Sequence, residues 1–210
     1  MKRRLNAEER RRVLCDAAVE VLAQEGARGL THRKVERRAG LPDGTTSSYF
    51  PTRSALLRAT AERVAELDVA DFEAVTTQPS SEPAAATTLS LLAEMVMRSA
   101  AGPALNRSRA RYELALHAHR DAVLRAAFDD AIAGFVALSE QAVTQVQPDG
   151  FIDRELVEQQ ARAVTTFING VMVRQVLGPR PVDSAEELTR LLHALVAGIA
   201  ASHHVHADQV

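Results

Sequence analysis

Residues 31–53 of this 210-residue chain gather side chains suited to hydrogen bonding with a polyanion. Small hydroxylated residues run from Thr45 to Ser48, and such groups can approach phosphates and base edges at little desolvation cost. Arg33 adds a guanidinium fork that matches O6 and N7 of guanine. The candidate DNA-binding residues in this segment are Thr31, His32, Arg33, Asp43, Gly44, Thr45, Ser47, Ser48, Tyr49 and Arg53.

Different roles are expected within this set. We expect Arg33 to contact a base, because a fork can distinguish guanine from the other bases. Asp43 has two interpretations, since a carboxylate near a helix N-terminus could cap the helix or could accept a hydrogen bond from cytosine N4. The residues expected to hold phosphates are Thr31, Thr45, Tyr49 and Arg53.

Catalytic motifs do not accompany these residues. The sequence contains no nucleophile elbow, phosphate loop or metal-protease helix. One histidine cluster lies at the alanine-rich C-terminal end, where a frayed, solvated tail is a better interpretation than a metal site. We therefore predict a protein that is not an enzyme and needs no metal or cofactor. The clustered histidines are His203, His204 and His206.

Two short helices around a tight turn would position the candidate DNA contacts. Thr31 is a good N-cap for a helix over 32–39, and Gly40 suits the left-handed conformation that follows a last helical turn. Pro42 then precedes a second helix over about 43–50. Apolar or small residues spaced four apart give each helix one buried face. The residues predicted to face the core are Val35, Ala39, Thr46 and Phe50.

Residues 8–60 resemble the DNA-binding domain of the TetR family of bacterial transcriptional regulators. Three pieces at the usual spacing support the resemblance: VLCDAAVEVLAQEGARGLT, the turn AGLPDGTTSSYF, and PTRSALL at the start of the next long helix. The chain departs from the family pattern at Pro42, where a serine cap is frequent, and at Thr46 and Ser47, where an apolar residue and a tyrosine are common.

The resemblance implies an all-α fold with two domains. An N-terminal three-helix helix-turn-helix domain would cover 1–52, and a helical ligand-binding and dimerisation domain would cover 53–210. Helical periodicity runs through almost the whole chain, and no segment alternates as a strand would. Further helices are expected at about 7–25, 53–76 (the link between the domains), 84–101, 104–119, 121–146, 154–177 and 185–203. Ser184 and Glu187 are predicted to form a capping box at the start of the last helix.

Charge distinguishes the N-terminal segment from the rest of the chain. Residues 1–58 carry a balance of +6 and residues 59–210 a balance of −8. A basic segment gains affinity for DNA by releasing phosphate counterions, and an acidic remainder would help to orient the molecule. The sequence lacks an apolar run of about 18 residues and the apolar core of a signal peptide, which predicts a cytoplasmic protein. The single cysteine, Cys15, has apolar neighbours that favour a core residue over a redox sensor.

The last two helices each carry an apolar stripe that is too wide for one contact. Gly170 and Gly198 lie inside these helices, and a close helix approach would offset their cost of about 1 kcal/mol relative to alanine. In the TetR family the final two helices pair across a homodimer, so a homodimer through about 154–177 and 185–203 is expected. Ordinary core helices of a monomer are the alternative.

The resemblance also implies a small-molecule effector bound in the helical domain. Large apolar or amphipathic residues are candidates for the wall of its pocket, although core packing is an alternative for each of them. These residues are Phe72, Met95, Met97, Tyr112, His117, Phe128, Phe135 and Phe167. Arg109, Glu113 and Asn169 could orient the ligand, and Arg109 and Glu113 are four apart and could instead pair with each other.

Three functional interpretations follow. The first is a homodimeric repressor that binds palindromic operator DNA and is released by a small molecule. The second is a DNA-binding protein of the same fold without a small-molecule effector. The third is a helical enzyme or carrier with a basic N-terminal bundle. Steep salt dependence and selection of a palindrome separate the first two from the third.

Overall fold

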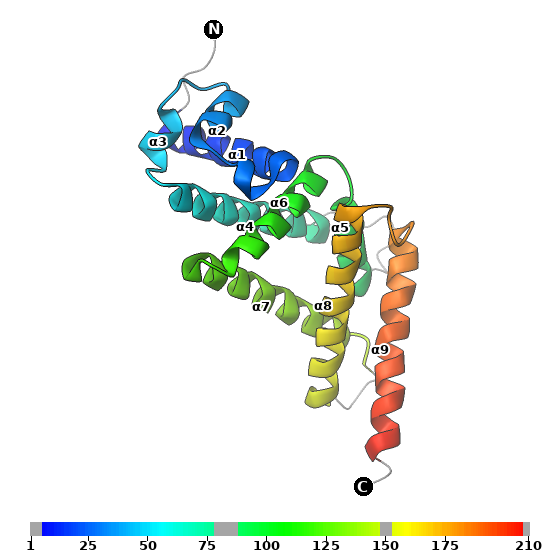
Figure 1. Cartoon of the computed structure of the whole chain (residues 1–210). Coiled ribbons are helices and arrows are strands. Elements are labelled where there is room, and N and C mark those ends of the chain that lie inside the picture. The colour runs from blue at the N-terminus through cyan, green and yellow to red at the C-terminus, as the bar shows by residue number, and fades with distance from the viewer. Residues whose placement is uncertain (1–5, 78–87, 148–152, 208–210) are drawn as a thin grey trace. The chain divides into compact units, whose positions relative to one another are not determined.

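The computed structural model describes residues 6–77, 88–147 and 153–207, and this part of the chain contains helices and no strand (Figure 1). The prediction of an all-α fold is therefore confirmed. The helices are α1 (Ala7–Gly29), α2 (His32–Ala39), α3 (Thr45–Tyr49), α4 (Arg53–Thr77), α5 (Thr88–Arg98), α6 (Gly102–Ala118), α7 (Ala122–Thr144), α8 (Arg154–Leu177) and α9 (Ala185–Ala207).

Local capping explains where several helices begin. Asn6 and Glu9 form a reciprocal capping box at the start of α1. At α9 the Ser184 hydroxyl accepts from the Glu187 N–H at 3.1 Å, but the Glu187 carboxylate accepts from the Asp183 N–H at 2.8 Å. Ser184 thus caps α9 as predicted, while the return hydrogen bond of the predicted box goes to the preceding residue.

Three glycines with positive φ lie where the structure differs from the predicted helix bounds. Gly26 (φ 67°, ψ 179°) interrupts α1, which then continues for one more turn to Gly29. Gly44 (φ 83°) is the N-cap of α3 and delays that helix to Thr45, so α3 is shorter than the predicted 43–50. Gly102 (φ 54°) begins α6, two residues before the predicted start at about 104.

The chain forms two compact units, and each contains two stretches of sequence. The first unit comprises 1–70 and 102–129, and the second comprises 71–101 and 130–210. The domain boundary expected at residue 52 falls inside the first unit. Helices α4 and α7 each run from one unit into the other.

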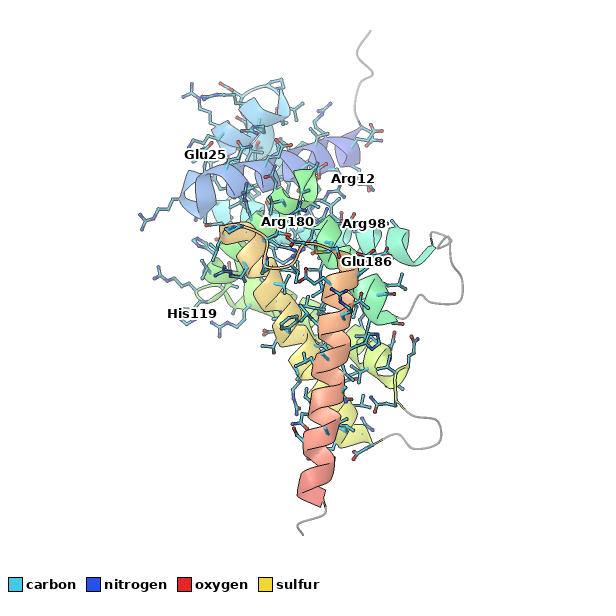
Figure 2. All side chains as sticks on the ribbon, turned by 90° about the vertical axis from the view of Figure 1, so that its right-hand side faces the viewer. Arg12, Glu25, Arg98, His119, Arg180 and Glu186 are labelled. Atoms are coloured by element: carbon cyan, nitrogen blue, oxygen red, sulfur yellow. The ribbon has the colours of Figure 1, made fainter. Side chains whose placement is uncertain are left out.

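A separate hydrophobic core stabilises each unit. In the first, α1 packs against α2 and α6 around fully buried leucines such as Leu14, Leu22 and Leu114. In the second, α9 packs against α5 and α8 around Leu92, Ile168 and Leu192. Figure 2 shows the side chains on these helices and labels Arg180, which donates to the Ala100 carbonyl at 3.4 Å within the second unit. None of the described helices has the length and apolar character needed to cross a bilayer.

Candidate nucleic-acid interface

The orientation of α3 relative to α2 depends on a buried carboxylate. Glu36, on α2, is 3% exposed, and its Oε1 accepts from the Thr46 N–H at 2.7 Å. Its backbone carbonyl accepts from the Leu41 N–H at 3.0 Å, and Gly40 adopts the predicted left-handed conformation (φ 65°) between them. A helix N-terminus stabilises a negative charge nearby. The buried Glu36 carboxylate therefore binds the first turn of α3 and fixes its position relative to α2. Glu36 was not among the residues predicted from the sequence, because an acidic residue in a short basic helix is usually solvated.

The predicted core face of the two helices is largely buried. Val35, Thr46 and Phe50 are at most 2% exposed, and Ala39 is partly buried against the same core. The Oγ1 atom of Thr46 has no hydrogen-bond partner in the described structure. Thr46 is one of the positions at which this chain departs from the family pattern.

Most of the predicted DNA-binding residues lie on the surface of the first unit. Their backbones come from the start of α2, the turn before α3, α3 itself and the first residue of α4, and Figure 1 shows these elements together. The exposed members are Thr31, Arg33, Asp43, Gly44, Ser47, Ser48 and Arg53; His32, Thr45 and Tyr49 are half-buried. Helix α3 therefore buries Thr46 on one side and exposes a polar face on the other.

Internal hydrogen bonds orient several of these side chains. The Thr45 hydroxyl donates to the Pro42 carbonyl at 2.6 Å, and the Ser48 hydroxyl donates to the Thr45 carbonyl at 2.7 Å. The Thr31 hydroxyl caps α2 by accepting from the Lys34 N–H at 3.3 Å, as predicted. Each hydroxyl oxygen keeps lone pairs, and Ser48 and Thr45 have already committed their proton inside the protein.

His32 is held by the end of α3. Its Nε2 lies 2.7 Å from the Phe50 carbonyl, which can only accept, so Nε2 carries the proton and donates. The guanidinium of Arg11 lies 5.3 Å from the centroid of the Phe50 ring and pairs with Glu62 at 3.3 Å. These contacts fix the segment between α3 and α4.

The basic residues of α2 fall into two groups. Lys34 pairs with Glu25, and Arg38 pairs with Glu20 at 3.0 Å, so both turn toward α1 (Glu25 is labelled in Figure 2). Arg33 and Arg37 are exposed, and neither has an ion-pair partner in the described part of the chain. Arg33 thus keeps all its donors for an external partner.

Asp43 makes no capping hydrogen bond to α3. The N-cap position is Gly44, which has no side chain, and the Thr46 N–H donates to Glu36 instead. Of the two interpretations of Asp43, helix capping is therefore not supported by any hydrogen bond. The Asp43 carboxylate is exposed to solvent.

Arg53 is engaged within the protein. Its Nη2 donates to the Ala27 carbonyl, and its Nη1 lies 3.5 Å from Nε2 of His117 on α6. The Ala27 N–H donates to Glu113, also on α6, at 2.9 Å. Glu113 therefore pairs with a backbone amide, and the described structure shows no ion pair between Glu113 and Arg109.

The predicted effector-binding residues divide between the two units. Phe128 packs against the first core, while the apolar candidates of the second unit are partly buried against the second core. Arg109, Tyr112, Glu113 and His117 are half-buried on α6, and burial raises the pKa of Tyr112. Asn169 is exposed on α8, and the Phe72 side chain lies outside the described residues. The second-unit candidates that pack on its core are Met95, Met97, Phe135 and Phe167.

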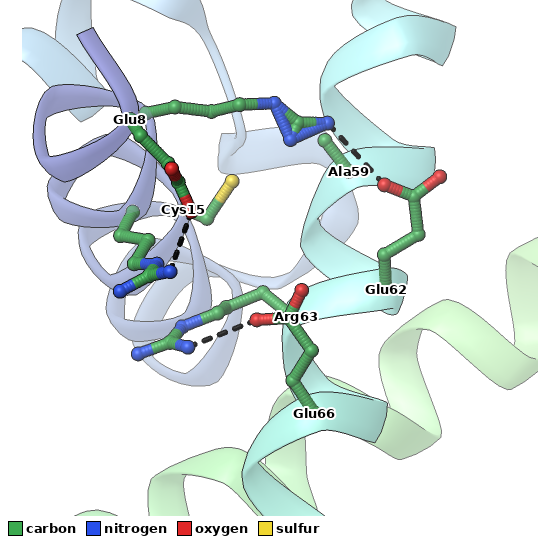
Figure 3. Close-up of a pocket in the computed structure, with 8 residues that line it drawn as sticks. Glu8, Cys15, Ala59, Glu62, Arg63 and Glu66 are labelled. Carbon is green, nitrogen blue, oxygen red and sulfur yellow. Dashed lines mark hydrogen bonds and ion pairs between the residues drawn. The ribbon is translucent and has the colours of Figure 1, made fainter.

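Cys15 lies at the base of a hollow of about 260 Å³ between α1 and α4, shown in Figure 3. The thiol is 2% exposed, and burial raises its pKa to about 11. The interpretation of Cys15 as a core residue is confirmed. The remaining lining is mostly charged and consists of Glu8, Arg11, Arg12, Ala59, Glu62, Arg63 and Glu66.

Among the described residues, helices α8 and α9 leave one face without a packing partner. A Cβ added at Gly170 or Gly198 would meet nothing within 4 Å, so no described helix packs closely on either glycine. A hollow of about 360 Å³ lies beside Gly198. It is lined by Gln159, Ala194, Leu195, Gly198, Ile199 and Ser202.

The C-terminal histidines differ from the predicted frayed end. Helix α9 continues to Ala207, and His203 Nδ1 lies 3.8 Å from Oδ2 of Asp153, the N-cap of α8. The alanine-rich sequence explains the longer helix, since alanine is the best helix former. The His204 and His206 side chains lie outside the described residues, and the described ones contain no group of metal ligands.

Two family models match the chain, and together they cover most of it. Residues 14–60 match the bacterial regulatory proteins of the tetR family. Residues 83–198 match the tetracyclin repressor-like C-terminal domain. No curated protein matches the chain.

Solved structures agree with the family models. A TetR-family member from Streptomyces coelicolor A3 is 26% identical with a TM-score of 0.67, over 89% of this chain and 98% of that one. The multidrug binding protein EbrR complexed with ethidium is 26% identical with a TM-score of 0.62, over 89% and 98%. A transcriptional regulator from Rhodococcus sp. Rha1 is 16% identical and shares the fold, with a TM-score of 0.71 over 94% and 97%. The chain therefore belongs to the TetR family of bacterial transcriptional regulators, with an N-terminal helix-turn-helix DNA-binding domain.

Proposed function

We propose that this protein is a homodimeric repressor in the bacterial cytoplasm that binds a palindromic operator and is released by a small molecule. The observation that carries the proposal is the outward polar face of α2 and α3, held by the buried Glu36, in a chain of the TetR family. Regulation of transcription requires no catalysis, so the protein acts by binding alone.

Arg33 is the proposed base contact. It is exposed on the first turn of α2, and no carboxylate of the described structure neutralises it. The exposed Ser47 and Ser48 on α3, with Thr31 and Tyr49 beside them, are proposed to contact phosphates. Asp43 is proposed to accept from cytosine, since capping of α3 does not employ it.

A second copy of the chain is the proposed partner of the α8–α9 face. Exposed Gly170 and Gly198 allow a close helix approach, and Leu191 is 40% exposed on the same helix as Gly198. A two-fold pairing would present two copies of α3 to successive major-groove faces, about 34 to 36 Å apart or somewhat more.

The effector is proposed to be a small aromatic molecule. EbrR has been solved with ethidium, malachite green and proflavin, all of which are flat or propeller-shaped aromatic compounds. Methionine and phenylalanine side chains suit such ligands, and Met95, Met97, Phe135 and Phe167 are incompletely buried in the second unit.

Selection of bound DNA from a random pool tests the proposed DNA binding. We expect a palindromic consensus with half-sites about one helical turn apart, bound with an affinity that falls steeply with salt. Recovery of unrelated sequences, or equal affinity for the consensus and random DNA, would refute the proposal.

Effector binding needs a test without DNA, because ethidium and proflavin themselves bind nucleic acids. A shift of the melting temperature of the free protein by malachite green would support an aromatic effector. Release of the operator by the same compound would support the proposed control of DNA binding by that effector. A regulator whose operator binding resists such compounds would instead match the alternative of a TetR-family protein without a small-molecule effector.

A further inference from the structure

The corner between α1 and α2 is formed by a break in the helix. Gly26 has φ 67° and ψ 179°, which ends the regular part of α1 and turns the chain before the Thr31 N-cap of α2. Ala27 follows the break and is 6% exposed, so its peptide groups must find partners inside the protein.

Helix α6 supplies the partner of the Ala27 amide. Oε2 of Glu113 accepts from the Ala27 N–H at 2.9 Å, across a sequence separation of 86 residues. The fit is close, because a Cβ added at Gly26 would lie 3.2 Å from the same oxygen. A hydrogen bond to a carboxylate is stronger than one between neutral groups.

The first residue of α4 supplies the partner of the Ala27 carbonyl. Nη2 of Arg53 donates to that oxygen, which also accepts from the Leu30 N–H at 3.3 Å. His117 stands one turn beyond Glu113 on α6, with its Nε2 3.5 Å from Nη1 of Arg53. We call the four residues Ala27, Arg53, Glu113 and His117 the Ala27 clamp.

We propose that Glu113 is a positioning residue for DNA recognition, acting through the Ala27 clamp, in which Arg53 also serves. Glu113 accepts from the Ala27 N–H and Arg53 donates to the Ala27 carbonyl, so the two charged side chains fix the backbone at the corner before α2. Thr31 and Arg33 follow that corner directly, so a shift of Ala27 displaces the proposed base contact. The inference rests on the proposed operator binding.

Helix α6 thereby becomes part of the DNA-reading unit, although it lies far beyond the matched N-terminal region of residues 14–60. From the sequence, Glu113 was a candidate for orienting an effector, His117 a candidate for the wall of its pocket, and Arg53 a candidate phosphate contact. In the clamp Glu113 and Arg53 instead bind the backbone of Ala27, and His117 contacts Arg53.

Operator and random DNA affinities of three variants test this role. Glu113→Ala removes the acceptor, and we expect the ratio of operator to random affinity to fall about tenfold, as expected for the loss of one hydrogen bond to a charged group. Glu113→Gln keeps an acceptor oxygen and should restore most of that ratio. Glu66→Gln is the matched control, because it removes the same charge from an exposed side chain of the same unit and should leave the ratio unchanged.

The ratio separates positioning from simple loss of folded protein. Partial unfolding lowers the active fraction and therefore reduces both affinities equally, whereas a displaced corner harms the operator contacts more than the phosphate contacts shared by all DNA. Hydrogen exchange at the Ala27 amide provides a measurement without DNA, and we expect faster exchange in Glu113→Ala.

Different results would contradict the positioning role of Glu113 and the proposed operator binding. Faster Ala27 exchange with an unchanged affinity ratio would overturn the positioning role and leave the proposed operator binding intact. Failure of Glu113→Gln to restore the ratio would also overturn it. A wild-type protein without any preferred site would overturn the proposed function and this inference together.

Discussion

At the scale of single residues, buried polar groups determine how the reading surface is presented. Glu36 places a carboxylate at 3% exposure beneath α3, where its partner is the Thr46 N–H. Without the Glu36 carboxylate the Thr46 amide would be buried and unsatisfied, and this would cost more free energy than the hydrogen bond itself contributes. Glu36 therefore helps to fix the geometry of α3 from the buried side of that helix.

Substitution of Glu36 tests this statement. Glu36→Ala should lower the free energy of unfolding by about 1 to 3 kcal/mol, because the Thr46 amide loses its acceptor. Glu36→Gln keeps an oxygen in place and should cost less. Urea unfolding of the two variants measures both, and equal stabilities for Ala and Gln would show that the hydrogen bond contributes little.

Arg33 and Arg38 provide a matched pair on one helix. Arg33→Ala should weaken operator binding by about 1 to 3 kcal/mol and relax preference at one position per half-site. Arg38 pairs with Glu20, so Arg38→Ala should weaken binding less and leave sequence preference intact. Competition assays with single-base operator variants measure the preference, and uniform weakening by Arg33→Ala on all of them would identify a phosphate contact.

Cys15 should be unreactive in the folded protein. Its thiol is 2% exposed and has a pKa of about 11 instead of the ordinary 9.0, so almost no thiolate forms at pH 8. We expect a disulfide reagent to label Cys15 only as fast as the protein unfolds. Because the folded pKa is raised, the associated stability is full below pH 9 and is lost as the pH rises toward 11. Rapid labelling under native conditions would indicate an open path through the hollow of Figure 3.

At the scale of elements, positive-φ glycines determine where helices stop. Gly26 interrupts α1 and Gly44 delays α3, so both set the path of the chain around the reading surface. Glu113 on α6 then accepts from the Ala27 N–H, directly after the break at Gly26. The helix-turn-helix thus depends on an element that lies outside the N-terminal sequence motif.

A pair of glycine substitutions separates backbone strain from helix propensity. Gly26→Ala places a side chain at φ 67° and ψ 179°, a conformation essentially restricted to glycine, and crowds Glu113, so it should destabilise the protein by about 1 to 3 kcal/mol. Gly134 lies within α7, without a positive φ and with nothing within 4 Å of an added Cβ, so Gly134→Ala should be neutral or stabilise by up to about 1 kcal/mol. Thermal melts compare the two, and equal melting temperatures would contradict the assigned strain.

At the scale of the whole molecule, two units of interleaved sequence carry different parts of the proposed function. The first unit contains the reading helices together with α6, and the second contains α5, α8 and α9. The net charge is +6 over residues 1–58 and −8 over the rest, which favours approach of DNA to the N-terminal segment. The unpartnered face of α8 and α9 is where a second copy is proposed to bind.

A charge placed on that face should break the proposed dimer. Leu191 lies on the same stripe of α9 as Ala194 and Gly198, and Leu191→Glu should weaken self-association at least about tenfold, because an unpaired carboxylate would be buried. Leu116→Glu, at a leucine that is 77% exposed on α6, is the control and should stay dimeric. Sedimentation equilibrium measures both. An unchanged association constant for Leu191→Glu would place the interface elsewhere.

The sequence by itself determined the helical fold, the caps at Thr31 and Gly40, and the TetR motif, because these depend on local propensities and on periodicities that a short segment contains. Only the tertiary structure decided which polar residues are internal. Glu36 and Glu113 look like solvated or ligand-orienting acids in the sequence, and each instead holds a backbone amide. Such pairings join residues up to 86 positions apart and arise when packing buries an amide that needs an acceptor.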